Sequence, residues 1–552
     1  MIADYQIWLQ KADTKLHDSL KSMNTNDIED AFRCNLAFGT GGLRGVIGAG
    51  TNRMNIYTVA KASQGLADYV NACAGKSIAV SYDSRIQSDV FAQVASGVFA
   101  ANGIHAFIYP QIMPTPCLSF AVRYLSCSAG IMITASHNPA KYNGYKIYGS
   151  DGCQITDEAA EQILSKIEKL DIFDDVKKMS FEDGMKAGLI EWIPVEVYDS
   201  YIDAVKKQSL IGNEVADHNV SIVYTPLNGT GLKPVMRSLH ESGFINVTVV
   251  DEQEKPDGNF PTCPYPNPEI REAMMLGIQY AQKCHADLLL ATDPDCDRVG
   301  IAFKDKVGEY KLLSGNEVGL LLLDYICARR TALNTMPQDP VMIKTIVTID
   351  LAERIAEHYG VRTINVLTGF KYIGEQIGLL EAKGQADSYI FGFEESYGYL
   401  SGSYVRDKDG VNGVLLVCEM FAYYKMHGIS LLDKLDEIYE VYDYCLNTLH
   451  SYTFEGAAGF EKMQRILESL RRNIDSIGGK DVIKRFDYQD GLDGLPKSNV
   501  LKFMLKDNCS VVIRPSGTEP KLKMYTSVSA ESNKAAGAVE KIIADWAEAQ
   551  FA

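Results

Sequence analysis

The sequence lacks the features that mark several large classes of protein. Its twelve cysteines are scattered singly from Cys34 to Cys509, with no C-x-x-C pair. This pattern suits neither a zinc ribbon nor a dithiol redox motif and fits reduced thiols. No Walker A sequence occurs, which disfavours an ATP-driven kinase of the P-loop type. The most apolar run, residues 319–326, is interrupted by Asp324, so no membrane span is expected.

Positive charge is also scarce. The chain has 54 Lys and Arg against 71 Asp and Glu, a formal net charge of -17 that repels nucleic acid and anionic membranes. Any anionic ligand must therefore be held by locally placed cations. Residues 1–9 include Asp4 and lack the positive flank and apolar core of a signal peptide. We therefore expect a cytoplasmic protein with neither a nucleic-acid nor a membrane partner.

A length of 552 residues exceeds what one hydrophobic core usually supports, which predicts three or four domains. Several segments repeat one order: a short apolar run, a loop with Gly, Pro or Asp, and then a helical period. Residues 77–82 precede such a helix at 90–103, and residues 221–224 precede a helix that ends at Leu239. This order predicts an α/β fold with mixed or mainly parallel sheets, whose ligands lie in loops beyond the strand ends.

The two ends of the chain differ from this middle part. Residues 1–37 are predicted to form a helical extension with Trp8, Leu9 and Leu16 on one face. Near the carboxyl end, residues 511–528 predict two strands joined by a turn and followed by a helix, which indicates a smaller α+β domain. We place the domains at residues 1–207, 208–312, 313–450 and 451–552.

Residues 134–146 follow an apolar strand and form the first loop that suggests chemistry. Pro139 disfavours helix at the preceding residue, and Asn143-Gly144 favours a tight turn. Ser136 and His137 should therefore be presented at a strand end.

Ser136 is a poor nucleophile unless a base or a cation assists it. His137 and Lys146 are candidates for that assistance because they lie nearby in sequence. The alternative is a surface loop whose serine and asparagine only make turn hydrogen bonds.

A second loop follows the apolar strand at residues 288–291 and carries Asp293, Asp295 and Asp297. Carboxylates at alternate positions can converge on one divalent cation, with Mg²⁺ the expected ion. An EF-hand is excluded because its sixth and twelfth positions are Arg298 and Lys304. The sequence also departs from the haloacid-type phosphatase motif, and a solvated acidic turn is the structural alternative.

A third loop begins at Arg514. The guanidinium fork of Arg514, the hydroxyls of Ser516 and Thr518, and backbone amides freed by Gly517 make a plausible phosphate cradle. We expect this loop to bind a phosphate group of the ligand that takes no part in the reaction. The alternative is a plain β-hairpin turn.

The fourth loop, residues 392–398, carries Glu394 and Ser396, which suit vicinal sugar hydroxyls. Capping of a following helix is the competing interpretation. Residues 38–45 superficially resemble a dinucleotide-binding loop, but Arg44 occupies the third required glycine position. We therefore interpret Arg44 as an anion contact.

Taken in order, these four loops resemble the phosphohexomutase superfamily of phosphoglucomutases and phosphomannomutases. The resemblance spans residues from about Phe38 to the carboxyl terminus, and it is strongest for the branch of bacterial phosphoglucomutases and phosphoglucomutase/phosphopentomutase-like enzymes. It implies four domains around a central cleft, the first three with related mixed-sheet α/β cores and the fourth a smaller α+β domain. Gly41, Cys296 and Phe393 depart from residues that are common in the family.

The resemblance also implies roles for individual residues. Ser136 would be the phosphoserine, and one of its phosphate oxygens would complete a magnesium site. The other implied metal ligands are Asp293, Asp295 and Asp297. The residues implied to line the reacting phosphate are Arg44, His137, Lys146 and Arg298. The residues implied to contact the sugar and the distal phosphate are Lys371, Glu394, Ser396, Arg514, Ser516, Gly517 and Thr518.

The implied activity is that of a phosphoglucomutase that interconverts glucose 1-phosphate and glucose 6-phosphate. The reaction would pass through a phosphoserine enzyme and glucose 1,6-bisphosphate, which would also serve as activator. Phosphomannomutase or phosphopentomutase activity, or a catalytically silent sugar-phosphate sensor, are the alternatives. The expected partners are hexose or pentose phosphates, and the protein is expected to be a monomer or weak homo-oligomer. Lys146 and His137 both remain candidates for the general base.

Overall fold

The computed structural model describes residues 2–39, 41–212, 218–472, 474–492, 494–516 and 520–551. The chain separates into two compact units. The first unit comprises Met1–Leu313, Phe370–Tyr389 and Tyr397–Tyr423, and the second comprises Ser314–Gly369, Ile390–Ser396 and Tyr424–Ala552. Within the described ranges, no helix combines the length and the apolar character needed to cross a membrane.

The first unit begins with the helical extension that the sequence predicts, made of α1 (Ile2–Lys11), α2 (Thr14–Lys21) and α3 (Thr25–Phe32). Trp8 is buried at its centre. The indole ring packs edge-on against Phe32 and Tyr57, with ring centroids 5.8 Å and 5.3 Å away. Tyr57 lies on α4 (Ile56–Ala72), so an aromatic contact fixes the extension to the domain that follows it.

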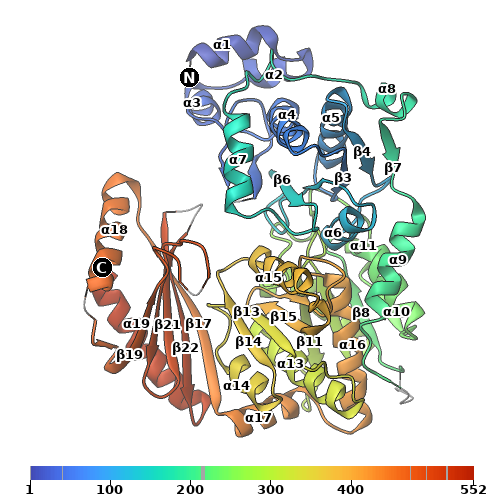
Figure 1. Cartoon of the computed structure of the whole chain (residues 1–552). Helices are drawn as coiled ribbons and strands as arrows, with labels where there is room; N and C mark the ends of the chain where they lie inside the picture. Colours follow the sequence, from blue (N-terminus) through green and yellow to red (C-terminus); the bar gives the residue numbers. More distant parts are fainter. Residues whose placement is uncertain are drawn as a thin grey trace. The chain divides into compact units, whose positions relative to one another are not determined.

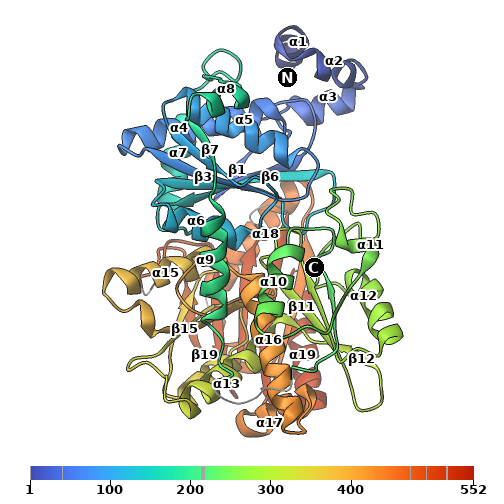
Figure 2. The same ribbon diagram turned by 90° about the vertical axis from the view of Figure 1, so that its right-hand side faces the viewer.

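A mixed sheet forms the core of this domain, with strands in the order β1-β2-β6-β5-β3-β4-β7. The strands β3, β4, β5 and β7 run parallel, whereas β6 and β2 pair antiparallel at one side. Figure 2 shows α4 and α5 on one face of the sheet and α6 on the other. Strands covered on both faces are apolar throughout, and β5 is buried along its whole length. The bounds of the strands are β1 (Phe38–Gly39), β2 (Gly42–Val46), β3 (Ser77–Tyr82), β4 (His105–Ile108), β5 (Ala129–Ile133), β6 (Tyr142–Gly149) and β7 (Ile190–Trp192). Those of the remaining helices are α5 (Ser88–Ala101), α6 (Thr115–Tyr124), α7 (Asp157–Ile167), α8 (Phe181–Lys186) and α9 (Val195–Lys206).

A second sheet of the first unit has the order β12-β11-β10-β8-β9, with β9, β8 and β10 parallel. The apolar strand predicted at residues 288–291 is confirmed as β10, which continues to Thr292. The bounds of its strands are β8 (Ile222–Thr225), β9 (Val247–Val249), β10 (Leu288–Thr292), β11 (Val299–Lys304) and β12 (Tyr310–Leu312). The other elements of the first unit are α10 (Leu232–Glu241), α11 (Asp251–Glu254), α12 (Arg271–Cys284), α15 (Phe370–Ala382), η1 (Ala386–Ser388), β16 (Gly398–Leu400) and most of α16 (Gly410–Met426).

The second unit holds two further sheets (Figure 1). In one of them β13 lies between its parallel neighbour β14 and β15. The elements of this part are α13 (Gly315–Ala332), β13 (Val341–Thr345), α14 (Leu351–His358), β14 (Arg362–Val366), β15 (Tyr389–Glu394) and α17 (Leu431–Tyr442).

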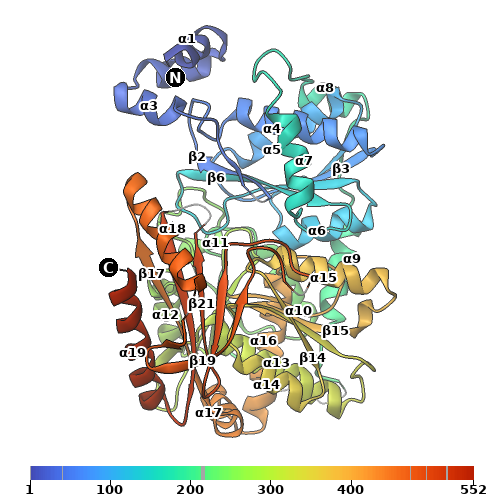
Figure 3. The same ribbon diagram turned by 60° about the vertical axis from the view of Figure 1, so that its left-hand side comes forward.

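The carboxyl-terminal sheet has the order β17-β22-β21-β20-β19-β18 and is antiparallel throughout. Figure 3 shows α18 and α19 along one face of it, and their apolar residues share a core with β20, β21 and β22. The smaller α+β domain predicted from the sequence is thus confirmed. The elements are β17 (Tyr444–Thr453), α18 (Gly456–Arg472), β18 (Ser476–Ile477), β19 (Lys480–Asp487), β20 (Leu501–Leu505), β21 (Cys509–Pro515), β22 (Lys521–Ala530) and α19 (Asn533–Phe551).

A buried ionic network joins the two sheets of the second unit. Asp350, just before α14, pairs with Lys502 of β20 at 2.8 Å and with Lys344 of β13 at 3.4 Å. Lys344 also pairs with Glu353 at 3.0 Å. Burial alone would raise the pKa of Asp350, but the charges of Lys502 and Lys344 outweigh it and lower that pKa.

Replacing Asp350 by asparagine should destabilise the second unit by about 3 kcal/mol at pH 7, because Lys344 and Lys502 stay buried without their shared partner. A carboxyl whose folded pKa is lowered stabilises the protein above its unfolded pKa of about 4, and this contribution falls as pH drops towards the folded value. The difference between wild type and Asp350→Asn should therefore shrink between pH 7 and pH 3.5. Urea unfolding followed by circular dichroism at both pH values measures it. Asp339→Asn, an exposed change in the same unit, serves as control, and an equal deficit for Asp350→Asn at both pH values would contradict the argument.

Candidate active site

Ser136 lies on the loop that follows β5, which we call the serine loop (residues 134–142). Its backbone has φ = 49°, in the left-handed region, a conformation that costs a residue with a Cβ roughly 1–2 kcal/mol. The Ser136 N–H donates to Thr134 Oγ1 at 2.8 Å. This strained geometry therefore depends on contacts within the loop and around it.

Arg85 provides most of the surrounding contacts. Its buried guanidinium donates to the carbonyls of Ser136 and Asn138, and to those of Pro139 and Tyr142 at 3.1 Å and 3.0 Å. Asp83 lies 3.4 Å from Arg85 Nε and is itself buried. One fixed cation thus holds several carbonyls of the serine loop together. The contact of Arg85 with these carbonyls was not predicted, although Asp83 and Arg85 follow the predicted strand at residues 77–82.

The prediction of a tight turn at Asn143-Gly144 is wrong, because both residues lie inside β6. Gly144 pairs with Arg44 of β2. A Cβ on Gly144 would lie 2.5 Å from the carbonyl oxygen of Thr134 and 2.9 Å from that of Leu43. Glycine is required here for close backbone approach rather than for a turn, a purpose that the same dipeptide does not reveal in sequence.

Asp293, Asp295 and Asp297, the Asp triad, follow β10 and are buried. A carboxylate oxygen from each lies within 4.8 Å of the others. Ser136 Oγ donates to Asp293 Oδ2 at 2.7 Å, so the serine loop and the Asp triad meet although 157 positions separate the two residues. Thr115, at the start of α6, adds a hydrogen bond from its Oγ1 to Asp295 Oδ2 at 3.0 Å.

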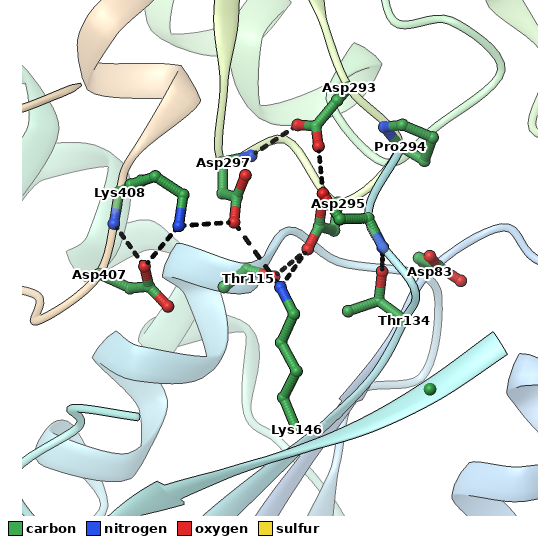
Figure 4. Close-up of polar contacts among 12 residues, drawn as sticks. Asp83, Thr115, Thr134, Lys146, Asp293, Pro294, Asp295, Asp297, Asp407 and Lys408 are labelled. Atoms are coloured by element: carbon green, nitrogen blue, oxygen red, sulfur yellow. Dashed lines mark hydrogen bonds and ion pairs between the residues drawn. The ribbon is translucent and has the colours of Figure 1, made fainter. Parts of the chain in front are cut away.

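Two lysines balance the charge of the Asp triad (Figure 4). Lys146 Nζ lies 2.8 Å from Asp295 Oδ2 and 3.7 Å from Asp297 Oδ2. Lys408 Nζ lies 3.1 Å from Asp297 Oδ2 and 3.1 Å from Asp407 Oδ1. Lys408 was not predicted. The available signal was a run of alternating charges, residues 406–409, directly before the apolar helix α16.

The Asp triad fits a divalent metal ion. The Oδ1 atoms of Asp295 and Asp297 are buried and accept no hydrogen bond from any residue that the structure describes. Burial and the negative charges of its two neighbours raise the pKa of Asp293 well above its ordinary value. Burial acts in the same direction on Asp295, but the charge of Lys146 lowers its pKa. Buried carboxylate oxygens that lie this close together are the ligands that a hard divalent cation prefers.

His137 has its Nδ1 3.1 Å from Ser136 Oγ. Burial and the positive charges of Arg298 and Arg44 lower the pKa of His137 well below its ordinary value. The ring is therefore neutral at pH 7. Arg44 Nη1 donates to Asn138 Oδ1 at 3.4 Å, and Arg298 pairs with Glu269. The structure thus brings the predicted residues Arg44, His137, Lys146 and Arg298 to the serine loop and the Asp triad.

Lys371, near the start of α15, is placed differently from the other cations. Its Nζ pairs with Asp157 Oδ1 at 2.9 Å, and the side chain is only 8% exposed. The ammonium also lies over the Tyr372 ring, 4.8 Å from the centroid. This predicted sugar contact is therefore held by a carboxylate of α7.

Glu394 and Ser396 lie in the second unit, at the end of β15. Glu394 Oε1 accepts a hydrogen bond from the backbone N–H of Gly369 at 2.9 Å, and Ser396 is half-buried. Phe393 points to the opposite face of the strand, where its ring covers Gly319 of α13: a Cβ on Gly319 would lie 2.2 Å from the ring. Phe393, which departs from the residue common in the family, thus packs in the core. Glu394 lies on the other face of the strand.

Arg514 lies at the end of β21 in the same unit. Its Nη2 donates to Tyr525 Oη at 3.2 Å, while its buried Nε makes no hydrogen bond to the part of the chain that the structure describes. Burial raises the pKa of Tyr525, Arg514 opposes this, and the charges of Glu395 and Glu394 add to it. The Ser516 N–H donates to the carbonyl of Lys521 at 2.8 Å. The other two predicted residues of this loop, Gly517 and Thr518, lie outside the described residues.

Comparison with known proteins agrees with this arrangement. Residues 35–172, 199–308 and 314–442 match, in that order, the alpha/beta/alpha domains I, II and III of phosphoglucomutase/phosphomannomutase. The chain belongs to the phosphoglucomutase/phosphomannomutase family. The family predicted from the sequence is thus confirmed. The protein is an enzyme of the mutase class.

Named relatives extend the match over nearly the whole chain. The phosphoglucomutase of Staphylococcus saprophyticus is 39% identical over 542 residues, covering 95% of this chain and 96% of its own length. The phosphoglucomutase of Staphylococcus aureus is 38% identical over 544 residues, covering 95% of both chains.

Solved structures share the fold at lower identity. The open form of parafusin, a phosphoglucomutase of Paramecium, superposes with a TM-score of 0.71 at 17% identity, covering 94% of this chain and 96% of its own. A phosphoglucomutase/phosphomannomutase family protein of Burkholderia thailandensis gives 0.68 at 18% identity, covering 93% and 97%.

Replacing Asp295 by asparagine should weaken divalent-cation binding by about 100-fold or more, because it removes a charged ligand and leaves Lys146 facing a neutral amide. Titration with Mn²⁺, followed by electron paramagnetic resonance, counts bound ions and gives the affinity. Wild type should bind one ion at this site. Asp251→Asn, an exposed change on α11, should bind like wild type, and an unchanged affinity in Asp295→Asn would disprove the assignment.

Proposed function

We propose that this protein is a phosphoglucomutase that interconverts glucose 1-phosphate and glucose 6-phosphate. The phosphoryl group would be carried on Ser136, and glucose 1,6-bisphosphate would be the intermediate and the activator. The observation that carries the proposal is the 2.7 Å hydrogen bond from Ser136 Oγ to Asp293, beside a buried site that fits a divalent cation. Support also comes from relatives named phosphoglucomutase at 38–39% identity.

Mg²⁺ is the proposed cation, held by Asp293, Asp295, Asp297 and an oxygen carried on Ser136. When bound, it would supply positive charge to the phosphoryl oxygens, on which catalysis of phosphoryl transfer largely depends. Arg44 and Arg298 would add to this charge from the protein. Lys146 and Lys408 would then serve mainly to hold the Asp triad in place.

The proton would be handled by His137. Its lowered pKa keeps the imidazole neutral, so a ring nitrogen can accept a proton at pH 7. Lys146 is less suited to this step because Asp295 and Asp297 hold it as a cation and raise its pKa despite burial. We therefore favour His137 over Lys146 as the general base.

The first transfer would move the phosphoryl group from Ser136 to the 6-hydroxyl of glucose 1-phosphate. A bond forms between the hydroxyl oxygen and phosphorus, the bond to Ser136 Oγ breaks, and the hydroxyl proton passes to His137. His137 would pass that proton to Ser136 Oγ. The bisphosphate would then turn over, and Ser136 Oγ would bond to the phosphorus at position 1 while the bond from that phosphorus to sugar O1 breaks. The proton of Ser136 Oγ would pass through His137 to O1, which releases glucose 6-phosphate. The enzyme thus regains its phosphoserine.

The second unit would recognise the rest of the substrate. Arg514, with Ser516, Gly517 and Thr518, would bind the phosphate that does not react, and the buried unpaired Nε of Arg514 supports this role. Glu394 and Ser396 would contact sugar hydroxyls. Lys371, which belongs to the first unit, would also contact the sugar. To reach a sugar oxygen, its ammonium would have to leave Asp157.

Phosphomannomutase activity is the second candidate because the matching family includes both activities, and phosphopentomutase activity would use the same chemistry. Rates on glucose, mannose and ribose 1-phosphates distinguish the three. We also propose a cytoplasmic monomer or weak homo-oligomer without a nucleic-acid partner, with domain limits near residues 207, 312 and 450.

Ser136→Ala should lower mutase turnover by at least about 10³-fold, because the variant cannot form the covalent intermediate. A coupled assay with glucose 1-phosphate, Mg²⁺ and a trace of glucose 1,6-bisphosphate measures turnover. Intact-mass measurement after incubation with the bisphosphate should show one added phosphate on wild type and on the exposed-serine control Ser150→Ala, but none on Ser136→Ala. Wild-type turnover in Ser136→Ala would refute the phosphoserine assignment.

Arg514→Lys should raise the KM for glucose 1-phosphate by about 10- to 100-fold, because lysine lacks the planar fork that binds phosphate through two hydrogen bonds. The same assay, run over a range of substrate concentrations, separates KM from kcat. Arg472→Lys makes the same replacement at an exposed position and should leave both constants unchanged. A KM for Arg514→Lys equal to that of wild type would exclude Arg514 from phosphate binding.

A further inference from the structure

A cavity of about 310 Å³ lies in the first unit behind the β1–β2 hairpin. Its walls are mostly apolar side chains: Leu36, Phe38, Leu43, Leu164 and Ile167. Among the lining residues of the described chain, none belongs to the serine loop or the Asp triad. The volume is at the lower end of that of small-molecule sites, so the cavity suits a compact ligand rather than a sugar bisphosphate.

One cation reaches this apolar space. Lys61, on α4, is half-buried and makes no hydrogen bond or ion pair with any residue that the structure describes. Burial lowers the pKa of Lys61, while the charges of Asp171 and Glu168 raise it. The ammonium of Lys61 is therefore available to pair with an anion placed in the cavity.

The amino-terminal extension completes the wall. Ile172 lines the cavity and packs in the same core as Trp8 and Phe173. The Leu36 N–H donates to the carbonyl of Thr51 at 2.8 Å, which fixes the segment that leads from the extension to β1. Most of the extension precedes residue 35, where the first family domain begins. The cavity itself lies within that domain, because the residues that line it run from Asn35 to Ile172.

We propose that this cavity binds a small organic monoanion, whose carboxylate pairs with Lys61 and whose apolar body fills the space between Phe38, Leu43 and Leu164. Glu168 also lines the cavity, and Asp171 and Asp175 act on Lys61 from nearby. These negative charges disfavour a dianion such as a phosphate monoester. The ligand class therefore differs from that of the substrate.

The cavity adjoins the strand that carries Arg44. Leu43 of β2 lines it, and the next residue, Arg44, points to the opposite face and donates to Asn138 of the serine loop. Leu36 also touches this strand, because a Cβ on Gly45 would lie 2.6 Å from its Cδ1. A bound anion would thus contact the back of a strand whose front faces the serine loop.

1-Naphthoate, a rigid aromatic monoanion, is a suitable probe, and its binding to the full chain can be followed by its fluorescence and by calorimetry. We expect saturable binding of one molecule per chain. Lys61→Met keeps the apolar stem and removes the charge, so it should weaken binding by about tenfold or more. Leu164→Trp should abolish binding by filling the cavity. The neutral 1-naphthamide should bind wild type about tenfold more weakly than the anion.

Lys178→Met is the matched control: Lys178 lies over the Tyr57 ring beside the extension, 5.1 Å from the centroid, but does not line the cavity. It should bind 1-naphthoate like wild type. Excess inorganic phosphate should not displace the probe, which separates this site from any phosphate site. The proposal is overturned if wild type shows no saturable binding, if phosphate displaces the probe, or if the affinity is unchanged by Leu164→Trp. Equal affinity for the anion and for the neutral amide would refute the role of Lys61 without needing that variant to fold.

Discussion

The site of this protein depends on one electrostatic constraint: three carboxylates are buried together and must be neutralised. Lys146 and Lys408 supply part of the compensating charge, and they approach from β6 and from the segment before α16. Ser136 donates a hydrogen bond to the same group. Elements far apart in sequence are held together because each contributes a charge or a hydrogen bond that the buried aspartates require. The fold of the first unit can be understood as the scaffold for this balance.

The scaffold follows from strand order. The loops that carry Ser136 and Asp293 begin at the carboxyl ends of β5 and β10, which are inner strands of two sheets in the first unit. Inner strands are buried on both faces and leave their loops little freedom. Arg85 then fixes the serine loop in a conformation that its backbone would not adopt alone. Rigid strands and a buried cation together account for the strained position in which Ser136 is held.

Much of this could be predicted from sequence, because apolar runs followed by Gly, Pro or Asp mark strand ends. The strands β3, β5, β10 and β21 were found in this way, and so were Ser136 and the aspartates that follow β10. The function of Arg85 and Lys408 depends on contacts with distant segments, which no local pattern encodes. The Asn143-Gly144 error has the same origin, since the dipeptide favours a turn locally but the carbonyls of Thr134 and Leu43 require glycine within β6. The ion pair of Lys371 with Asp157 could not be predicted from the sequence either, because it joins α15 to α7.

The packing of Phe393 on Gly319 has a consequence for how this sequence can vary. The ring occupies the volume that a side chain at position 319 would need, and overpacking of a core costs about 1–3 kcal/mol. The two positions therefore change together or not at all: a larger residue on α13 becomes tolerable only when the aromatic ring on β15 is exchanged for a smaller group. Divergence at the residue beside Glu394 is thus recorded in α13, which packs on the other face of β15.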